Sequence, residues 1–372
     1  MRIMLDATSL LGPSAGVKTY MYYWIRSIER SADRDAISLF PFFGGIGDLD
    51  HENSSVGRMR TTLAYLAVHF SNIKWNPVLE AVGCAADVFH ASQHLRNPPH
   101  LTTRLTATIY DMTCWLMPET HVPANVAATL QYGERVLRRA AACIAISEHS
   151  KKDAIEILKL PADRIDVIYP GVAEEFFTVG RPEAQAAAKR HGLDKPYFLY
   201  VGMIEPRKNV DRLLDAYRSI CEPVRNEHEL VVVGPLGWCS DATKDRLRSP
   251  EPGIRYLGYV SEDDLPGLTA GATAFVFPSL YEGFGLPLLQ AMACGVPAIA
   301  SRGSSLGELA GQDAMLVDPG STDEIAAAIE RLALSPSLRE DLGRRGRLRA
   351  ASFRWERTAR QSLAFFHKLA SC

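Results

Sequence analysis

A glutamate in front of a glycine turn and a helix start is the group of residues in this sequence best suited to chemistry. Glu282 precedes the turn at 283–285, and a helical run follows Pro287 and stops at Gly295. Glycines let a backbone turn tightly against a ligand, and the free N–H groups of a helix start attract anions. A carboxylate beside such a site suits a phosphorylated sugar, because the helix start holds phosphate while the carboxylate accepts hydrogen bonds from sugar hydroxyls.

Two adjacent cations form a second candidate group. Arg207 and Lys208 follow an apolar run at 197–201 and precede an amphipathic helix that we expect to begin near Asn209 or Val210. Arginine can bind two phosphate oxygens at once and lysine supplies a compact charge, so the pair suits a diphosphate. The alternative is a solvated basic turn, which explains the pair better when it is taken alone. Together with the 282–297 passage, the diphosphate interpretation is favoured.

The passage at 275–301 closely resembles the nucleotide-binding signature of the retaining glycosyltransferases of family 4, the group 1 glycosyltransferases of GT-B fold. The family pattern is a glutamate, seven residues and a second glutamate, and here the two positions hold Glu282 and Gln290. In the family the first glutamate meets the donor sugar and the second meets the ribose. Gln290 can still form a hydrogen bond, but an uncharged amide forms a weaker bond than the family's carboxylate, by about 1–2 kcal/mol.

The resemblance also implies which residues carry the reaction. The implied catalytic residues are Glu282, Asp111, Arg207 and Lys208. The implied donor-binding residues are Gly16, Arg207, Lys208, Gly234, Tyr259, Val260, Glu282, Gly283, Phe284, Gly285, Leu286 and Gln290. Asp111 would accept a proton from the acceptor hydroxyl or orient it, and Tyr110 stands where relatives often have histidine. No metal or cofactor is expected, because fixed positive groups replace the cation and the nucleotide sugar is a substrate.

Three further patterns have competing interpretations. The segment 12–19 nearly spells a Walker A loop, but Val17 occupies the second required glycine, so we favour a donor-facing loop with Gly16 as its key position over a plain helix start. Asp48 and Asp50 form a DxD motif in a polar loop, which we interpret as a chance surface match. His90 is either a residue of the site or a satisfied core histidine, with nothing to separate the two. Glu119 and His121 are assigned to an acceptor-side loop.

Strand-like runs alternate with helical runs in both halves of the chain. The runs lie at 3–7, 87–90, 107–110, 143–147 and 165–169, and then at 197–201, 229–234, 254–256, 274–278, 297–300 and 315–317. Such alternation predicts an α/β protein, and the resemblance implies the GT-B fold, two Rossmann-like domains with parallel sheets facing across a cleft. We predict an acceptor-binding domain at 1–175, a nucleotide-sugar-binding domain at 196–350 and a helix at 351–372 returning to the first domain.

Composition limits the class of protein and its compartment. The 372 residues are 47% apolar and 23% charged with a net charge of −2, which fits a soluble globular enzyme and argues against general nucleic-acid binding. The N-terminus resembles a first strand rather than a signal peptide, and no apolar run is long enough to span a membrane. Seven scattered cysteines without a CxxC pair fit reduced thiols in a cytoplasm.

The function implied by the resemblance is retaining, metal-independent transfer of a hexosyl group from a nucleotide diphosphate sugar to a glycan or lipid-linked glycan. The EPRKN and GFGLP strings are similar to bacterial mannosyltransferases that use GDP-mannose, and a UDP-hexose is the alternative donor. A non-catalytic GT-B protein that binds nucleotide sugar or carbohydrate is the other alternative, since Gln290 and Tyr110 depart from the family. The basic, amphipathic segment 56–75 would either rest on a membrane surface at its inner face or pack its apolar side on the first sheet.

Overall fold

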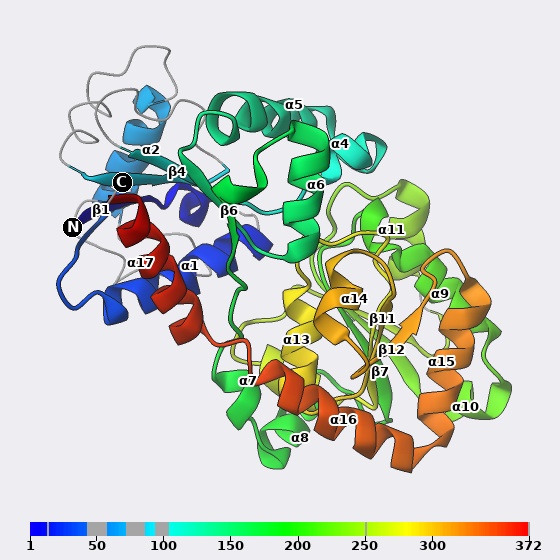
Figure 1. Cartoon of the computed structure of the whole chain (residues 1–372). Coiled ribbons are helices and arrows are strands. Elements are labelled where there is room, and N and C mark those ends of the chain that lie inside the picture. Colours follow the sequence, from blue (N-terminus) through cyan, green and yellow to red (C-terminus); the bar gives the residue numbers. More distant parts are fainter. Residues whose placement is uncertain (13–14, 43–57, 72–85, 94–103, 250, 371–372) are drawn as a thin grey trace. The chain divides into compact units, whose positions relative to one another are not determined.

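The computed structural model describes residues 1–12, 15–42, 58–71, 86–93, 104–249 and 251–370 (Figure 1). The chain divides into two compact units. The first unit comprises Met1–Pro118, Val122–Gly171 and Arg354–Cys372, and the second comprises Glu119–His121 and Val172–Phe353. Each unit is built around one sheet of six parallel strands, so each has its own row of strand carboxyl ends where loops can form a site.

The sheet of the first unit has the strand order β2-β1-β3-β4-β5-β6, and every neighbouring pair is parallel. The strands are β1 (Arg2–Asp6), β2 (Ala36–Phe40), β3 (Val88–Ala91), β4 (Arg104–Ile109), β5 (Ala142–Ala145) and β6 (Ile165–Val167). Five of them lie at the predicted runs. The edge strand β2 was not predicted, and only its last two residues are buried.

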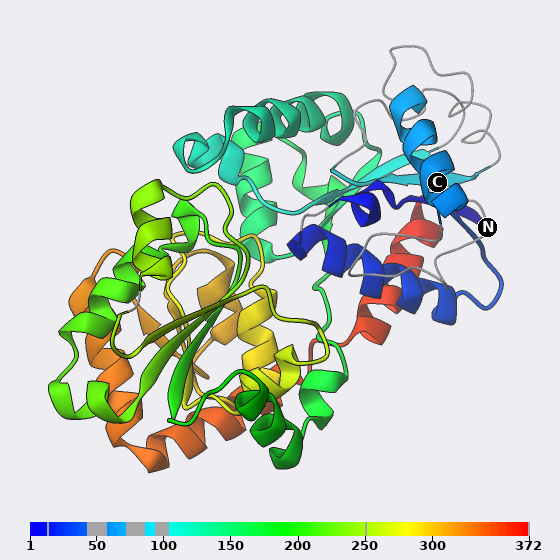
Figure 2. The ribbon, with the colours of Figure 1, turned by 180° about the vertical axis from the view of Figure 1, so that it is seen from behind.

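Helices cover both faces of this sheet. They are α1 (Ala15–Ser31), α2 (Arg58–Ser71), α4 (Thr113–Leu116), α5 (Pro123–Tyr132), α6 (Glu148–Leu158) and α17 (Trp355–Ala370), with the short helices η1 (Thr8–Leu11), η3 (Gly133–Leu137) and η4 (Ala162–Arg164). On one face α1 packs along α17 (Figure 2). The Trp24 indole donates a 2.9 Å hydrogen bond to the Ser362 hydroxyl. On the other face Ala67 of α2, Tyr132 of α5 and Ala154 of α6 pack on one apolar core.

The sheet of the second unit has the order β12-β11-β10-β7-β8-β9 and is also parallel throughout. Its strands are β7 (Tyr197–Val201), β8 (Glu229–Val233), β9 (Ile254–Gly258), β10 (Ala274–Phe277), β11 (Ala298–Ser301) and β12 (Met315–Val317). All six lie at predicted runs. The inner strands β7 and β10 are neighbours, so the loops that follow them meet at one edge of the sheet.

Ten α-helices lie in the described part of the second unit. They are α7 (Glu175–Thr178), α8 (Arg181–Arg190), α9 (Val210–Ser219), α10 (Glu222–Glu227), α11 (Asp241–Arg248), α12 (Leu265–Ala270), α13 (Leu286–Ala293), α14 (Ser304–Ala310), α15 (Thr322–Leu334) and α16 (Pro336–Ala350), with the short helix η5 (Pro206–Lys208). Helix α9 packs against α15, and α13 packs against α16. Leu213, Leu214 and Tyr217, the expected buried face of α9, are fully buried.

Two further features were sought among the described residues, membrane-spanning helices and free cysteines. No helix in the described ranges is both long enough and apolar enough to cross a membrane. Five cysteines have free thiols: Cys114, Cys143, Cys221, Cys239 and Cys294. Cys84 and Cys372 lie outside the described residues. Two parallel sheets with helices on both faces confirm the predicted α/β class.

Candidate active site

Glu282 forms two ion pairs at the edge where β7 and β10 end. Its Oε1 lies 2.5 Å from the Lys208 ammonium and its Oε2 lies 2.9 Å from an Arg207 guanidinium nitrogen. Lys208 also lies over the Phe277 ring, 5.1 Å from its centroid. Arg207 and Lys208 lie in η5 after β7, while Glu282 follows β10. The parallel sheet thus brings together the two groups that the sequence places about 75 residues apart.

Electrostatics keep Glu282 ionised although it is buried. Burial alone would raise the pKa of Glu282, but the charges of Lys208 and Arg207 outweigh that effect and lower the pKa to about 2. Only 7% of the residue is exposed. A buried carboxylate that stays charged at neutral pH can accept hydrogen bonds from sugar hydroxyls or stabilise positive charge that develops on a sugar.

Arg207 is held by more groups than the sequence indicated. Its guanidinium donates to a Glu205 carboxylate oxygen at 2.5 Å and to the Tyr281 carbonyl at 2.5 Å, in addition to Glu282. Glu205 is buried, and it was not singled out from the sequence although it stands within the EPRKN string. Two carboxylates around Arg207 fix the side chain, so its geometry suits a positioning role as well as the predicted phosphate contact.

Asn209 anchors the turn that carries the two cations. Its backbone has a φ of 61°, the left-handed region that asparagine tolerates better than most residues. Its side-chain amide donates to the carbonyls of Pro278 at 3.0 Å and of Pro319 at 2.8 Å. The turn after β7 is therefore tied to the chain that leaves β10 and to the loop after β12.

The helix start that follows Glu282 has the features of an anion site. Gly285 has a φ of 122°, and a Cβ there would come within 2.4 Å of a Leu306 methyl group, so only glycine fits. Its carbonyl accepts the first helical bonds of α13, from Leu288 and Leu289. The N–H groups of Gly285 and Leu286 donate to no other residue in the described ranges, which leaves them available to a phosphate.

Two serines that the sequence did not single out hold this loop. The Ser304 hydroxyl accepts a hydrogen bond from the Glu282 N–H at 3.2 Å. The Ser305 hydroxyl is fully buried and lies within hydrogen-bond distance of the Glu282 carbonyl, at 2.8 Å, and of the Phe284 carbonyl. Both serines begin α14, and the sequence shows no spacing that would link them to Glu282.

The remaining predicted donor contacts of the second unit differ in exposure. Gln290, on α13, is partly exposed, and its side chain forms no hydrogen bond with a described residue. Tyr259 is 60% exposed whereas Val260 is buried. Gly234 has a φ of 138°, and a Cβ there would lie 2.0 Å from the Gly202 carbonyl oxygen, so this glycine is required by the close approach of two backbones.

In the first unit, Asp111 makes local contacts at the end of β4. One carboxylate oxygen accepts hydrogen bonds from the Thr113 N–H at 3.0 Å and from the Thr113 hydroxyl at 2.6 Å. Tyr110 instead points into the core, where its hydroxyl lies 3.3 Å from the Met21 sulfur and its ring packs edge-on against Tyr20. Gly16 lies in the first turn of α1, and a Cβ added there would meet no described atom within 4 Å.

His90 is a core histidine. It is fully buried between the Trp24 and Phe366 rings, and its two ring nitrogens lie 2.9 and 2.8 Å from the hydroxyls of Thr106 and Thr108. Burial lowers the pKa of His90 to about 3, so the ring is neutral at physiological pH. Of the two interpretations left open by the sequence, the structure supports the structural one.

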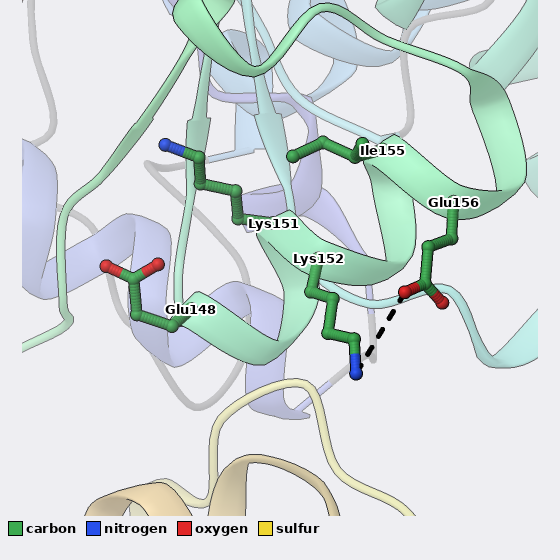
Figure 3. Close-up of a pocket in the computed structure, with 5 residues that line it drawn as sticks. All are labelled: Glu148, Lys151, Lys152, Ile155 and Glu156. Carbon is green, nitrogen blue, oxygen red and sulfur yellow. Dashed lines mark ion pairs between the residues drawn. The ribbon is translucent and has the colours of Figure 1, made fainter.

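The first unit also has a hollow on its surface. A shallow hollow of about 200 Å³ is lined by Glu148, Lys151, Lys152, Ile155 and Glu156, all from α6, and its ion pair joins Lys152 to Glu156 at 3.9 Å (Figure 3). Among the residues that the structure describes, no group of three or more His, Cys, Asp or Glu side chains could hold a metal ion. Asp48 and Asp50 lie outside those residues.

Comparisons with known proteins agree with this geometry. The family model of the glycosyl transferases group 1 matches residues 183–349. The O-antigen chain mannosyltransferase B of Escherichia coli is 35% identical over 268 residues, which cover 71% of this chain and 70% of that protein. The serotype-specific mannosyltransferase WbdA of the same species is 29% identical over 62% of this chain and 29% of its own length.

Solved structures give the fold. Anabaena HepE in complex with UDP-glucose superposes with a TM-score of 0.73 at 19% identity, covering all of both chains. A sucrose-phosphate synthase from Thermosynechococcus elongatus gives a TM-score of 0.75 at 18% identity, covering 100% of this chain and 99% of that one. These similarities and the two parallel sheets confirm the predicted GT-B fold, and the chain belongs to the group 1 glycosyltransferases.

Proposed function

We propose that the protein is a retaining, metal-independent hexosyltransferase of family 4 that transfers a mannosyl group from GDP-mannose to a glycan or lipid-linked glycan. The observation that carries the proposal is Glu282, which is buried, ionised and paired with Lys208 beside the open N–H groups of α13. Mannose is favoured because the relatives reported above are named mannosyltransferases. Transfer to a lipid-linked acceptor would take place at the inner face of a membrane, to which the protein would attach peripherally.

The proposed roles follow from the contacts of each group. Glu282 accepts hydrogen bonds from the sugar hydroxyls, and Gln290 accepts one from the ribose. Lys208 and the N–H groups of Gly285 and Leu286 stabilise the negative charge that builds on the diphosphate as the glycosidic bond breaks. Removing one such contact should lower the rate by about 10²–10³. Asp111 orients the acceptor hydroxyl or accepts its proton, through the carboxylate oxygen that Thr113 does not use.

The remaining predicted donor residues keep roles defined by position. Gly16 lets the backbone of the first unit approach the donor phosphate, and Gly234 keeps the end of β8 close to the end of β7. The chain at Tyr259 and Val260 meets the nucleobase. A UDP-hexose is the alternative donor, and a non-catalytic nucleotide-sugar-binding protein is the alternative function, favoured by the replacements at Gln290 and Tyr110.

Calorimetry with EDTA present tests the proposal. GDP-mannose, GDP, UDP-glucose and UDP are titrated into the native protein and into Glu282→Gln, with Glu156→Gln on α6 as the control. We expect binding of the guanine nucleotides, and a loss in Glu282→Gln that affects GDP-mannose but not GDP. Preference for the uracil nucleotides would replace GDP-mannose by a UDP-hexose, and binding that requires a divalent cation would refute metal independence.

A transfer assay separates the enzyme from the binding protein. Native protein, GDP-mannose and a mannose-containing acceptor are incubated in EDTA, and the anomeric configuration of the product is determined by NMR. Formation of an α-linked product from the α-linked donor would support retention. Donor binding without transfer to any glycan and without donor hydrolysis would favour the non-catalytic alternative.

A further inference from the structure

Arg207 contacts three consecutive residues of the loop that follows β10. Its backbone carbonyl accepts a hydrogen bond from the Leu280 N–H at 2.8 Å. Its guanidinium Nη1 donates to the Tyr281 carbonyl at 2.5 Å and to the Glu282 carboxylate at 2.9 Å. The main chain and the side chain of one residue therefore hold this loop up to the carboxylate that we assign to the sugar.

Glu205 holds the same guanidinium through its other terminal nitrogen. The Glu205 carboxylate accepts a hydrogen bond from Arg207 Nη2 at 2.5 Å, and the two side chains are 5% and 10% exposed. A charge-assisted bond between buried groups is strong and directional, so it favours one orientation of the guanidinium. Because Glu205 belongs to the same turn as Arg207, this bond joins no second loop. It fixes the direction in which Arg207 Nη1 points, toward residues 281 and 282.

The charges around Arg207 are unfavourable for a phosphate. Glu205 and Glu282 pair with its guanidinium at 2.5 and 2.9 Å, so the three groups together carry a net negative charge. Lys208 differs, because among the residues that the structure describes Glu282 is the one carboxylate with which it forms an ion pair. The two adjacent cations are therefore unequal: Lys208 keeps hydrogens for an anion, whereas Arg207 is surrounded by acceptors of its own chain.

We propose that Arg207 is a positioning residue that fixes the Glu282 carboxylate and the chain at 280–282 against the sugar, and that Glu205 keeps Arg207 in this orientation. This role replaces the phosphate contact that the sequence predicted for Arg207. The proposal rests on the proposed function, because the sugar that Glu282 binds is that of the proposed donor. Since a displacement of a reacting group by about 1 Å can lower a rate by about 10², loss of the contact should act mainly on kcat.

A charge-balanced double variant tests the proposal. Glu205→Gln/Arg207→Gln removes one negative and one positive charge, so a change in nucleotide binding reports lost contacts rather than lost net charge. The control Arg218→Gln/Glu251→Gln removes an ion pair of the same two residue types from the surface near the start of β9, at the other edge of the sheet. Calorimetry then compares GDP with GDP-mannose and UDP with UDP-glucose, and the transfer assay gives kcat.

We expect the double variant to bind the nucleoside diphosphate within about threefold of the native affinity. The ratio of nucleotide-sugar affinity to diphosphate affinity should fall at least about tenfold, and kcat should fall by about 10². The control should match the native protein in all three quantities. The affinity ratio tests the role of Arg207 whether or not the protein transfers the sugar.

A pair of single variants tests the role of Glu205 and serves if the double variant does not fold. Glu205→Ala and Glu205→Gln both remove one negative charge, but the amide oxygen of glutamine can still accept the bond from Arg207. We expect Glu205→Gln to keep most of the native kcat and Glu205→Ala to be at least about tenfold slower. A loss of stability alone, measured by urea unfolding, would not separate the two variants in kcat per folded molecule.

Three outcomes would overturn the proposal. They are a loss of diphosphate affinity of tenfold or more in the double variant, an unchanged affinity ratio in that variant, and equal kcat of Glu205→Ala and Glu205→Gln. If the native protein binds none of the nucleotides, the proposed function fails, and a carbon-13 NMR titration of the Glu282 carboxyl without ligand tests the positioning. Arg207 helps to lower the pKa of Glu282 to about 2, so the pKa should rise in the double variant, and an unchanged pKa would overturn the positioning role.

Discussion

Replacing Glu282 by glutamine should destabilise the second unit by an amount that the structure allows us to work out. The pKa of Glu282 falls from its ordinary 4.5 to about 2 in the folded protein, although burial acts in the opposite direction. At about 1.4 kcal/mol per pH unit, this corresponds to roughly 3 kcal/mol in favour of the ionised form. The substitution keeps the shape of the side chain but leaves Lys208 without a carboxylate, and breaking one side of a buried ion pair costs about 3–5 kcal/mol.

The pH dependence of this loss has a defined sign. Because the folded-state pKa of Glu282 is depressed, its contribution to stability is complete above pH 4.5 and disappears as the pH falls toward 2. The difference in unfolding free energy between the native protein and Glu282→Gln should therefore be about 3 kcal/mol near pH 7 and shrink progressively in acid. The exposed ion pair of Lys152 and Glu156 serves as the reference for a surface pair. Glu156→Gln should lower the unfolding free energy by less than about 1 kcal/mol.

Urea unfolding monitored by fluorine NMR of fluorotryptophan-labelled protein is the suitable assay. Trp238 is the only tryptophan in the sequence between residues 172 and 353, so its signal reports the second unit, while the signals of Trp24 and Trp115 report the first unit, which contains Glu156. Equal stability of Glu282→Gln and the native protein near pH 7 would refute the reasoning. A difference that stays constant from neutral to acid pH would refute the assignment of the effect to the Glu282 charge.

Three further predictions concern other residues. Gln290→Glu should tighten donor binding by up to about tenfold, because a carboxylate forms a stronger hydrogen bond to the ribose than an amide; unchanged calorimetric affinity would count against it. Burial lowers the pKa of His90 from 6.5 to about 3, so its contribution to stability should be complete above pH 6.5 and fall by about 1.4 kcal/mol per pH unit between pH 6.5 and about 3. In His90→Asn, the unfolding free energy measured with urea should not show this decrease with falling pH. Gly234→Ala should lower the melting temperature sharply, since the new methyl group would overlap the Gly202 carbonyl; a normal melting temperature would contradict the close approach.

The fold was largely predictable because its buried strands are apolar runs bounded by glycine and proline. Strands β7 and β12 have the predicted bounds, and the other predicted strands differ at their ends by a few residues. The edge strand β2 escaped prediction because an edge strand buries fewer residues and therefore carries a weaker pattern. The faces of α2 were also beyond the sequence, since the pattern shows an apolar side but not which side the sheet contacts.

Only those parts of the site whose residues lie next to one another in the sequence could be predicted. The GFG turn and the adjacent Arg207 and Lys208 are short-range patterns, so their chemistry could be inferred before their contact was known. The contact of Ser305 with the Glu282 carbonyl depends on tertiary packing, because the two residues are 23 positions apart and lie on different elements. Glu205 lies only two residues from Arg207, but the string does not show that the two side chains form an ion pair. His90 had two open interpretations because a sequence does not reveal which strand residues face the core.

The charge of the Glu282 site has a consequence for substrate binding. Glu205 and Glu282 balance Arg207 and Lys208, so the four groups together carry no net charge. Because this cluster offers a diphosphate no excess positive charge, we expect the diphosphate to bind to the N–H groups of Gly285 and Leu286 and to the Lys208 hydrogens that Glu282 does not use. After transfer, the released nucleotide carries one more negative charge than the donor and lies beside a fixed carboxylate. We therefore expect Glu282 to have two effects: it binds the sugar of the donor, and its negative charge weakens the binding of the nucleotide product. This repulsion would help the nucleotide to leave the site after transfer.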